Sequence, residues 1–203
     1  IFRGVDLRLS VRGGTPEEAE ARFEAWLAGV GHVIDPWRFE AEDGDIAASL
    51  VDALRRSGRT VAVAESCTGG LLGARITAVP GASDVFPGGV IAYANEAKVR
   101  DLGVSPESLE RHGAVSEAVA RQLAEGVARR FGADAGIGVT GVAGPGGGSE
   151  EKPVGTVWIG VSLDGETDAR LLRFPGGRTE IRERAAQSAL TLLLRRLQAV
   201  VRG

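Results

Sequence analysis

The first part of the chain shows one alternating stretch and then one helical pattern. Apolar and polar residues alternate over 5–11, which predicts a strand. Residues 15–18 (Thr-Pro-Glu-Glu) combine a hydroxyl cap, a proline and a glutamate, which is typical of a helix start, and we expect this helix to reach about Gly29. A polar, turn-like stretch then predicts a boundary near residue 43, so that 1–43 would form a small α+β unit.

Beyond that boundary, strand and helix patterns take turns along the chain. Strands that alternate with helices predict an α/β fold, a layered α/β/α domain with a mixed sheet over 44–203. Asp164-Gly165 is the two-residue turn expected of a hairpin. The predicted strands are 60–64, 90–93, 135–139, 154–163 and 166–174, and the predicted helices are 46–57, 71–78, 95–102, one from 106, 116–131 and 179–201.

Composition and charge narrow the class of protein. A chain of 203 residues with 43% hydrophobic content can bury a sizeable core. No apolar run is long enough to cross a bilayer and no signal peptide opens the chain, so we expect a cytoplasmic protein without a membrane partner. A net charge of −3 argues against a nucleic-acid partner, and a single cysteine fits a reducing compartment. Because the chain begins with Ile1 and lacks methionine, we expect a segment of a longer polypeptide.

A polar elbow follows the first strand of the main domain, where a helix is expected to begin. Ser66, Thr68, Gly69 and Gly70 would let a substrate approach the backbone and the positive end of that helix. The alternative is that Ser66 or Thr68 merely caps the helix. Cys67 has the character of a small buried residue more than of a nucleophile.

A second glycine-rich segment follows the third strand of the main domain. It lacks the lysine of a phosphate-binding Walker loop and leads into a strand, so it is either a flexible connection or a backbone cradle for phosphate or an oxyanion. We favour the cradle, with Arg178 at a predicted helix start as its partner for a nucleotide phosphate; the alternative is that Arg178 is solvated. The candidate binding residues of this segment are Thr140, Gly141, Gly144 and Gly146.

The candidate catalytic groups are the hydroxyl of Ser66 and the amine of Lys98. The two histidines are far apart and no acidic or sulfur ligands have metal spacing, so we assign no metal. A Ser-His-Asp triad would have to use His112, whereas Lys98 follows the strand next after Ser66 and could meet it at one end of the sheet. Only two of the 24 basic residues are lysine, Lys98 and Lys152, and lysine differs from arginine in that it can lose its proton.

Four motifs in one order, AESCTGG, VPGASDVFPGGVIAYANEAK, HGAVS and VTGVAGPGGGSEEKPVGTVWIG, resemble the CinA C-terminal domain, the nicotinamide-nucleotide amidase family. The resemblance covers roughly residues 45–200, and 1–43 resemble the end of the small KH-like middle domain of CinA proteins. It implies hydrolysis of the carboxamide of nicotinamide mononucleotide, without a metal or organic cofactor. Together with the common preference of proteins for two-fold assemblies, the resemblance also leads us to expect a homodimer. The implied nucleophile is Ser66, the general base Lys98, and the residue that orients or activates them Tyr93.

The sequence leaves two alternatives open and argues against a third function. The oxyanion donors could be the backbone N–H groups after Ser66 or those of Thr140 and Gly141. The domain could instead be a non-catalytic nucleotide-binding module of a larger competence- or damage-inducible protein. A phosphoryl-transfer enzyme would need magnesium, and this sequence lacks its carboxylate and Walker lysine.

Overall fold

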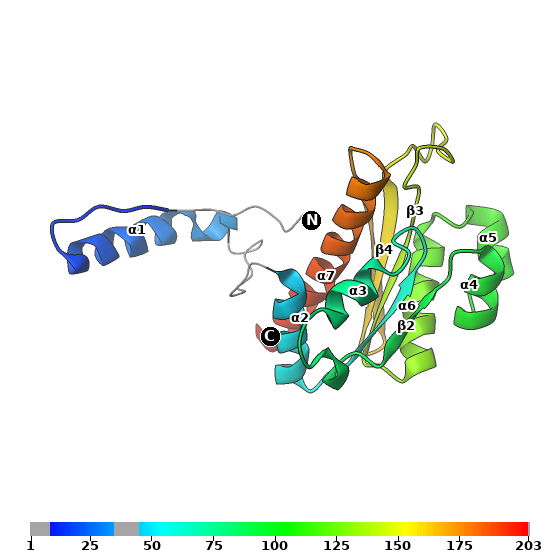
Figure 1. Cartoon of the computed structure of the whole chain (residues 1–203), viewed down its shortest axis with the longest axis horizontal. Helices are drawn as coiled ribbons and strands as arrows, with labels where there is room; N and C mark the ends of the chain where they lie inside the picture. Colours follow the sequence, from blue (N-terminus) through cyan, green and yellow to red (C-terminus); the bar gives the residue numbers. More distant parts are fainter. Residues whose placement is uncertain (1–8, 35–44, 203) are drawn as a thin grey trace.

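A computed structural model describes residues 9–34 and 45–202, and within 45–202 they form a three-layer α/β/α domain (Figure 1). Before this domain lies one helix, α1 (Pro16–Ile34). The domain contains the strands β1 (Val61–Glu65), β2 (Gly88–Ile91), β3 (Ala135–Gly141), β4 (Thr156–Leu163) and β5 (Glu166–Arg173). Its helices are α2 (Ile46–Ser57), α3 (Leu71–Thr77), α4 (Asn95–Leu102), α5 (Pro106–His112), α6 (Glu117–Phe131) and α7 (Arg178–Arg202), with a 3-10 turn η1 (Ala82–Asp84).

The five strands form one mixed sheet in the order β2-β1-β3-β4-β5. The first three strands of this order are parallel, and β4 and β5 are added antiparallel. The last residue of β1, Glu65, is paired with Ile91 of β2 and with Val139 of β3. The carboxyl ends of the three parallel strands therefore lie level, at one edge of the sheet.

Alternating side chains of β1 enter two separate cores. Val61 and Val63 pack with α2, α3 and α7 on one face, whereas Ala62 and Ala64 pack with α4 and α6 on the other. Every residue of β1 is buried, which is the pattern of a strand covered on both faces. Gly138 of β3 lets α6 approach closely, because a Cβ there would lie 2.6 Å from the Ala120 carbonyl oxygen. Both faces of β1 are thus covered, and its carboxyl end is the part of the strand that remains for chemistry.

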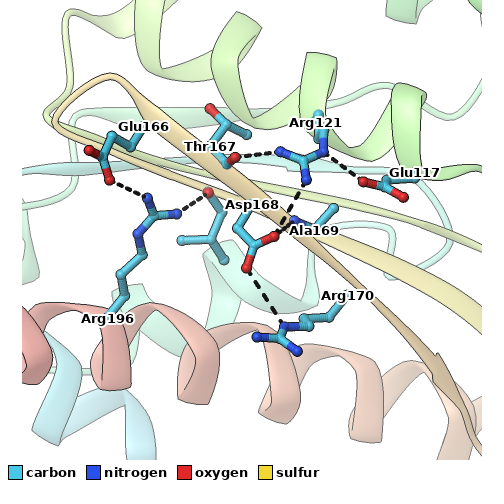
Figure 2. Close-up of polar contacts among 9 residues, drawn as sticks. Glu117, Arg121, Glu166, Thr167, Asp168, Ala169, Arg170 and Arg196 are labelled. Atoms are coloured by element: carbon cyan, nitrogen blue, oxygen red, sulfur yellow. Dashed lines mark hydrogen bonds and ion pairs between the residues drawn. The ribbon is translucent and has the colours of Figure 1, made fainter.

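The outer strand, β5, is held by side chains from both helical layers (Figure 2). Arg121 of α6 donates a hydrogen bond to the Thr167 carbonyl oxygen, and the Asp168 carboxylate accepts the Ala169 N–H at 2.8 Å. Arg196 of α7 pairs with the Glu166 carboxylate of β5 at 3.5 Å and donates to the Val161 carbonyl of the neighbouring β4 at 2.9 Å. Two outward-facing backbone groups of β5 therefore already have partners, which reduces the tendency of this outer strand to pair with a strand of another molecule.

The predicted α/β class and the succession of strands and helices beyond residue 44 are confirmed. Several boundaries move: β3 reaches Gly141 instead of Val139, β2 ends at Ile91, β4 begins at Thr156, and α7 begins at Arg178. None of the described helices has the length and apolar character needed to cross a membrane.

The described residues cover only part of the predictions made for the N-terminal region. The helix predicted from 15–18 is present but continues past Gly29 to Ile34, because Gly29 keeps a helical backbone instead of turning left-handed. Of the predicted strand 5–11, residues 9–11 are not in a strand and the others lie outside the described residues. The predicted boundary near residue 43 also lies outside them, and the KH-like character of 1–43 stays a prediction.

Candidate active site

The sequence-predicted residues are brought to the carboxyl edge of the sheet by four separate chain segments. Ser66 directly follows β1, Tyr93 and Lys98 follow β2, and the glycine-rich segment follows β3. Because β5 runs antiparallel to β4, its end lies at the same edge and delivers Arg178 there. Figure 1 shows the loop after β3 and the first turn of α7 at the same end of the sheet. In α/β sheets, ligands bind at such an edge, where the connections leave in opposite directions.

The elbow at Ser66 is a tight turn that needs its glycines. The Ser66 N–H donates to the Val139 carbonyl at 3.0 Å, which extends the pairing of β1 with β3 by one residue, and the Gly69 N–H returns to the Ser66 carbonyl at 3.1 Å. Gly69 and Gly70 both have positive φ angles, 60° and 99°, which L side chains adopt only at a cost. The turn leaves 9% of Ser66 exposed.

Neither Ser66 nor Thr68 caps α3, so that interpretation is wrong. The cap position is Gly70, and the Glu65 carboxylate accepts the N–H groups of Gly70, Leu72 and Gly73 at 2.9, 3.1 and 2.9 Å. Glu65 therefore occupies three of the N–H groups that the start of α3 was expected to offer to a substrate. The Thr68 hydroxyl is buried and has no hydrogen-bond partner among the described residues.

Lys98 is buried on α4 with 1% of its surface exposed. Its ammonium donates to the backbone carbonyl of Tyr93 at 3.0 Å, and no hydrogen bond joins it to Ser66 within the described part of the chain. Burial lowers the pKa of Lys98, and electrostatic interactions with Cys67 and Glu96 partly oppose this shift. The Ala92 N–H donates to the Glu65 carbonyl at 2.8 Å, so the Tyr93 carbonyl that Lys98 contacts lies next to the start of the elbow. A buried amine with a lowered pKa is what a general base requires.

Cys67 has the character expected of a small buried residue. It is 5% exposed, and burial is the main cause that raises the pKa of its thiol to about 11. The neighbouring Glu65 adds to this increase, whereas Arg182 and Arg178 oppose it. A neutral thiol is a weak nucleophile, so the elbow presents Ser66 as the better candidate.

Arg178 is anchored between two other candidate residues instead of being solvated alone. One guanidinium nitrogen donates to the Gly144 carbonyl at 2.9 Å, and the other donates to the Tyr93 hydroxyl at 3.1 Å. Tyr93 is 61% exposed, so its ring and hydroxyl border open space. Its hydroxyl faces Arg178, and only its backbone carbonyl contacts Lys98.

The glycine-rich segment is anchored at several points, which argues against a flexible connection. The Val142 N–H donates to the Thr156 carbonyl, and Gly155 donates back to Val142, both at 2.8 Å. Lys152 reaches the His112 carbonyl at 2.6 Å. Gly144 is buried, whereas a side chain at Gly146 would meet open space.

Thr140 and Gly141 differ from expectation because they lie in β3 and not in a loop. The Thr140 hydroxyl is committed to the Ala114 carbonyl at 2.8 Å, and it holds the HGAVS segment against the sheet. The proton of the Thr140 hydroxyl is therefore already donated, and its role in substrate binding stays a prediction.

Arg182 is a site residue that the sequence reasoning missed. Its guanidinium donates to the Thr68 carbonyl through two nitrogens, at 2.7 and 3.3 Å. It lies four residues after Arg178, so both side chains leave the same face of α7. The four-residue spacing from Arg178 was the feature of the sequence that could have identified Arg182. The two guanidinium groups make this edge of the sheet favourable for an anion.

No three or more of the described His, Cys, Asp and Glu side chains are grouped so that they could hold a metal ion. The fold and the site define a three-layer α/β domain whose polar site combines a serine elbow, a buried lysine and two arginines at the carboxyl edge of a mixed sheet.

Comparison with known proteins identifies the family. Residues 43–197 match the model of the CinA C-terminal domain, and this chain belongs to the CinA family. A CinA-like protein from Gemmatimonas aurantiaca is 50% identical over 192 residues, which cover 95% of this chain and 45% of the relative. A CinA-like protein from a Synechocystis species is 56% identical over 162 residues, 78% of this chain and 39% of the relative. The chain therefore spans less than half the length of these curated relatives.

Solved structures agree with this family. The competence/damage-inducible protein CihA from Agrobacterium tumefaciens is 39% identical, with a TM-score of 0.74 over 79% of this chain and 98% of that one. A CinA superfamily protein from Klebsiella pneumoniae is 34% identical, with the same TM-score over 76% of this chain and 96% of that one. The resemblance stated from the four motifs is confirmed.

Proposed function

We propose that this CinA domain is an amidase that hydrolyses nicotinamide mononucleotide to nicotinic acid mononucleotide and ammonia. The observation that carries the proposal is Lys98, a lysine with 1% of its surface exposed, whose amine binds the Tyr93 carbonyl next to the end of β1 and whose pKa is lowered by burial. A serine hydroxyl attacks an amide only when a base takes its proton, and a lysine can act as that base only when it is neutral.

The reaction proceeds through an acyl-enzyme. The Ser66 oxygen bonds to the carboxamide carbon while its proton passes to the Lys98 amine. The resulting ammonium returns the proton to the nitrogen, the carbon–nitrogen bond breaks, and ammonia leaves. A water molecule then attacks the ester and loses a proton to Lys98, which passes it to the Ser66 oxygen as the ester bond breaks. The product acid leaves as a carboxylate after giving its proton to solvent, and Ser66 and the neutral Lys98 are restored.

The oxyanion formed in both steps requires N–H donors near Ser66. The amides of Gly70, Leu72 and Gly73 are already bound by Glu65. This favours the N–H groups of Cys67 and Thr68, which directly follow the nucleophile.

The nucleotide phosphate has its best partner in Arg178. The Arg178 guanidinium lies exposed between Gly144 and Tyr93 and pairs with no carboxylate among the described residues. Tyr93 orients this guanidinium through its hydroxyl and supports the position of Lys98 through its carbonyl. Thr68, with its unpartnered buried hydroxyl, is the candidate for a further polar contact with substrate.

Ammonia release from nicotinamide mononucleotide by the purified chain tests the proposal, with Ser66→Ala and Cys67→Ala as a matched pair. We expect wild type and Cys67→Ala to release ammonia and Ser66→Ala to fold and release none. An active Ser66→Ala would show that the nucleophile is another group. Tight binding of the nucleotide by wild type without any release of ammonia would support a nucleotide-sensing module instead.

A further inference from the structure

Glu65 is a buried carboxylate that the proposed reaction does not use. It is the last residue of β1, directly before Ser66, and 2% of its surface is exposed. One carboxylate oxygen accepts the N–H groups of Gly70 and Leu72, and the other accepts that of Gly73. The side chain thus bends back from the strand and binds the first turn of the helix that follows the elbow.

Burial of the Glu65 carboxylate costs free energy, and its hydrogen bonds compensate for that cost. A buried carboxylate is unfavourable unless hydrogen bonds or charges satisfy it. Glu65 forms no salt bridge among the described residues, so three backbone N–H groups and the positive end of α3 provide the compensation. The same three N–H groups would otherwise lack partners at the start of the helix.

The consequence reaches Ser66. A serine or threonine at the cap position of a helix normally binds the first free N–H groups with its hydroxyl. The cap position of α3 is Gly70, which has no side chain, and the carboxylate of Glu65 accepts these N–H groups instead, so α3 does not use the hydroxyl of Ser66. Two further hydrogen bonds fix the turn: the Arg182 guanidinium donates to the Thr68 carbonyl, and the Ser66 N–H donates to the Val139 carbonyl.

We propose that Glu65 is a positioning residue, which fixes the Ser66 turn by binding the first turn of α3 and thereby keeps the serine hydroxyl free to react. Its effect on turnover rests on the proposed amidase function, whereas its effect on the turn does not.

The test compares Glu65→Gln with Asp134→Asn. Glu65→Gln keeps the side-chain shape but replaces one acceptor oxygen with an NH₂ group that faces N–H donors. Asp134 is a matched control, because its carboxylate accepts the N–H and the hydroxyl of Thr60 at 2.9 Å each, where β1 and β3 begin, at the opposite edge of the sheet. Glu65→Asp, which keeps the charge but withdraws it by one methylene, is the second variant if Glu65→Gln does not fold.

Two readouts separate positioning from general stability. Hydrogen exchange followed by NMR should show the amides of Gly70, Leu72 and Gly73 exchanging roughly tenfold to a hundredfold faster in Glu65→Gln, the size expected for lost charged hydrogen bonds. The kcat for ammonia release should fall about a hundredfold with little change in KM, because binding groups remain and the nucleophile is misplaced. Asp134→Asn should keep the kcat of wild type.

Unchanged protection of those three amides in Glu65→Gln would overturn the proposal. So would a loss of kcat no larger than that of Asp134→Asn. If wild type released no ammonia, the amidase proposal would fail, and the exchange rates alone would still decide whether Glu65 holds the turn.

Discussion

At the scale of single residues, Lys98 shows how a scarce residue type can mark a site. It is one of two lysines among 24 basic residues, and it is among the largest fully buried side chains of the described chain. A buried arginine would remain charged, whereas a buried lysine can become neutral. The other lysine, Lys152, is half-buried and donates to the His112 carbonyl, which anchors the glycine-rich segment.

We expect Lys98→Arg to fold and to lose nearly all turnover. Arginine keeps a positive charge at this position but cannot accept the proton of Ser66. Since the neutral amine is the active form, the wild-type rate should rise with pH up to the lowered pKa of Lys98 and then level off. Ammonia release measured across pH for both proteins provides the check. Substantial Lys98→Arg activity along the same pH curve would mean that another group accepts the proton.

The same pKa shift affects stability. Between the lowered pKa of folded Lys98 and the ordinary value near 10.4, the unfolded chain binds the proton more readily than the folded one. The contribution of Lys98 to the free energy of unfolding should therefore become less favourable as pH falls through that window. Lys98→Leu should remove this part of the pH dependence in a denaturant titration.

Arg178 is expected to recognise phosphate. Arg178→Ala should weaken binding of nicotinamide mononucleotide about tenfold to a hundredfold, while binding of nicotinamide riboside, which has no phosphate, changes little. Calorimetric titration of both ligands provides the measurement. Arg56→Ala, which removes an exposed arginine paired with Asp52 on α2, is the control and should alter neither. Equal losses for the two ligands would indicate that Arg178 only supports Tyr93 and Gly144.

At the scale of elements, the side chains that cover β5 protect an open sheet edge (Figure 2). Arg121 occupies the Thr167 carbonyl and is held by Glu117 and Asp168, and Asp168 occupies the Ala169 N–H. The protection is built from side chains of two different elements, α6 and β5. Its removal should expose backbone groups that another strand could bind.

The double variant Arg121→Ala/Asp168→Ala should therefore associate more readily than wild type while it keeps its ammonia release. Light scattering as a function of protein concentration measures the association. The control is Arg111→Ala, which breaks only an exposed pair with Glu107 on α5. A double variant with the association behaviour of wild type would show that these side chains do not protect the edge.

At the scale of the whole molecule, the candidate residues all lie within one layered domain. They extend from Glu65 to Arg182, and the residues that support them belong to the sheet and its two helical layers. Asp45 is the first described residue of this domain, and it caps α2 and pairs with Arg75 of α3 at 2.9 Å.

A chain that begins shortly before Asp45 should therefore fold and keep the kcat and KM of the full chain. Removal of Asp45 as well should lower the melting temperature, because the α2 cap and the Arg75 pair are lost, with about 1–2 kcal/mol at stake. Thermal unfolding and ammonia release of both truncations provide the measurements. Loss of turnover in the first truncation would assign part of the site to residues 1–43.

The sequence by itself determined the α/β class, the order of the elements, the hairpin at Asp164-Gly165 and the prominence of Ser66, Lys98 and Arg178. These follow from local properties: the hydrophobic period, the turn residues and the rarity of lysine. Local sequence patterns did not predict where the strands end, because the extension of β3 to Gly141 depends on its pairing with β4.

Only the tertiary structure decided how these residues act together. The sequence offered Ser66 or Thr68 as caps of α3, but the position of Glu65 at the end of a parallel strand lets its carboxylate reach the helix first. Arg182 contacts Thr68 across 114 positions of sequence, and Arg178 meets Tyr93 across 85. Such contacts arise because a parallel sheet aligns strand ends from distant parts of the chain at one edge, which local sequence periodicity does not specify.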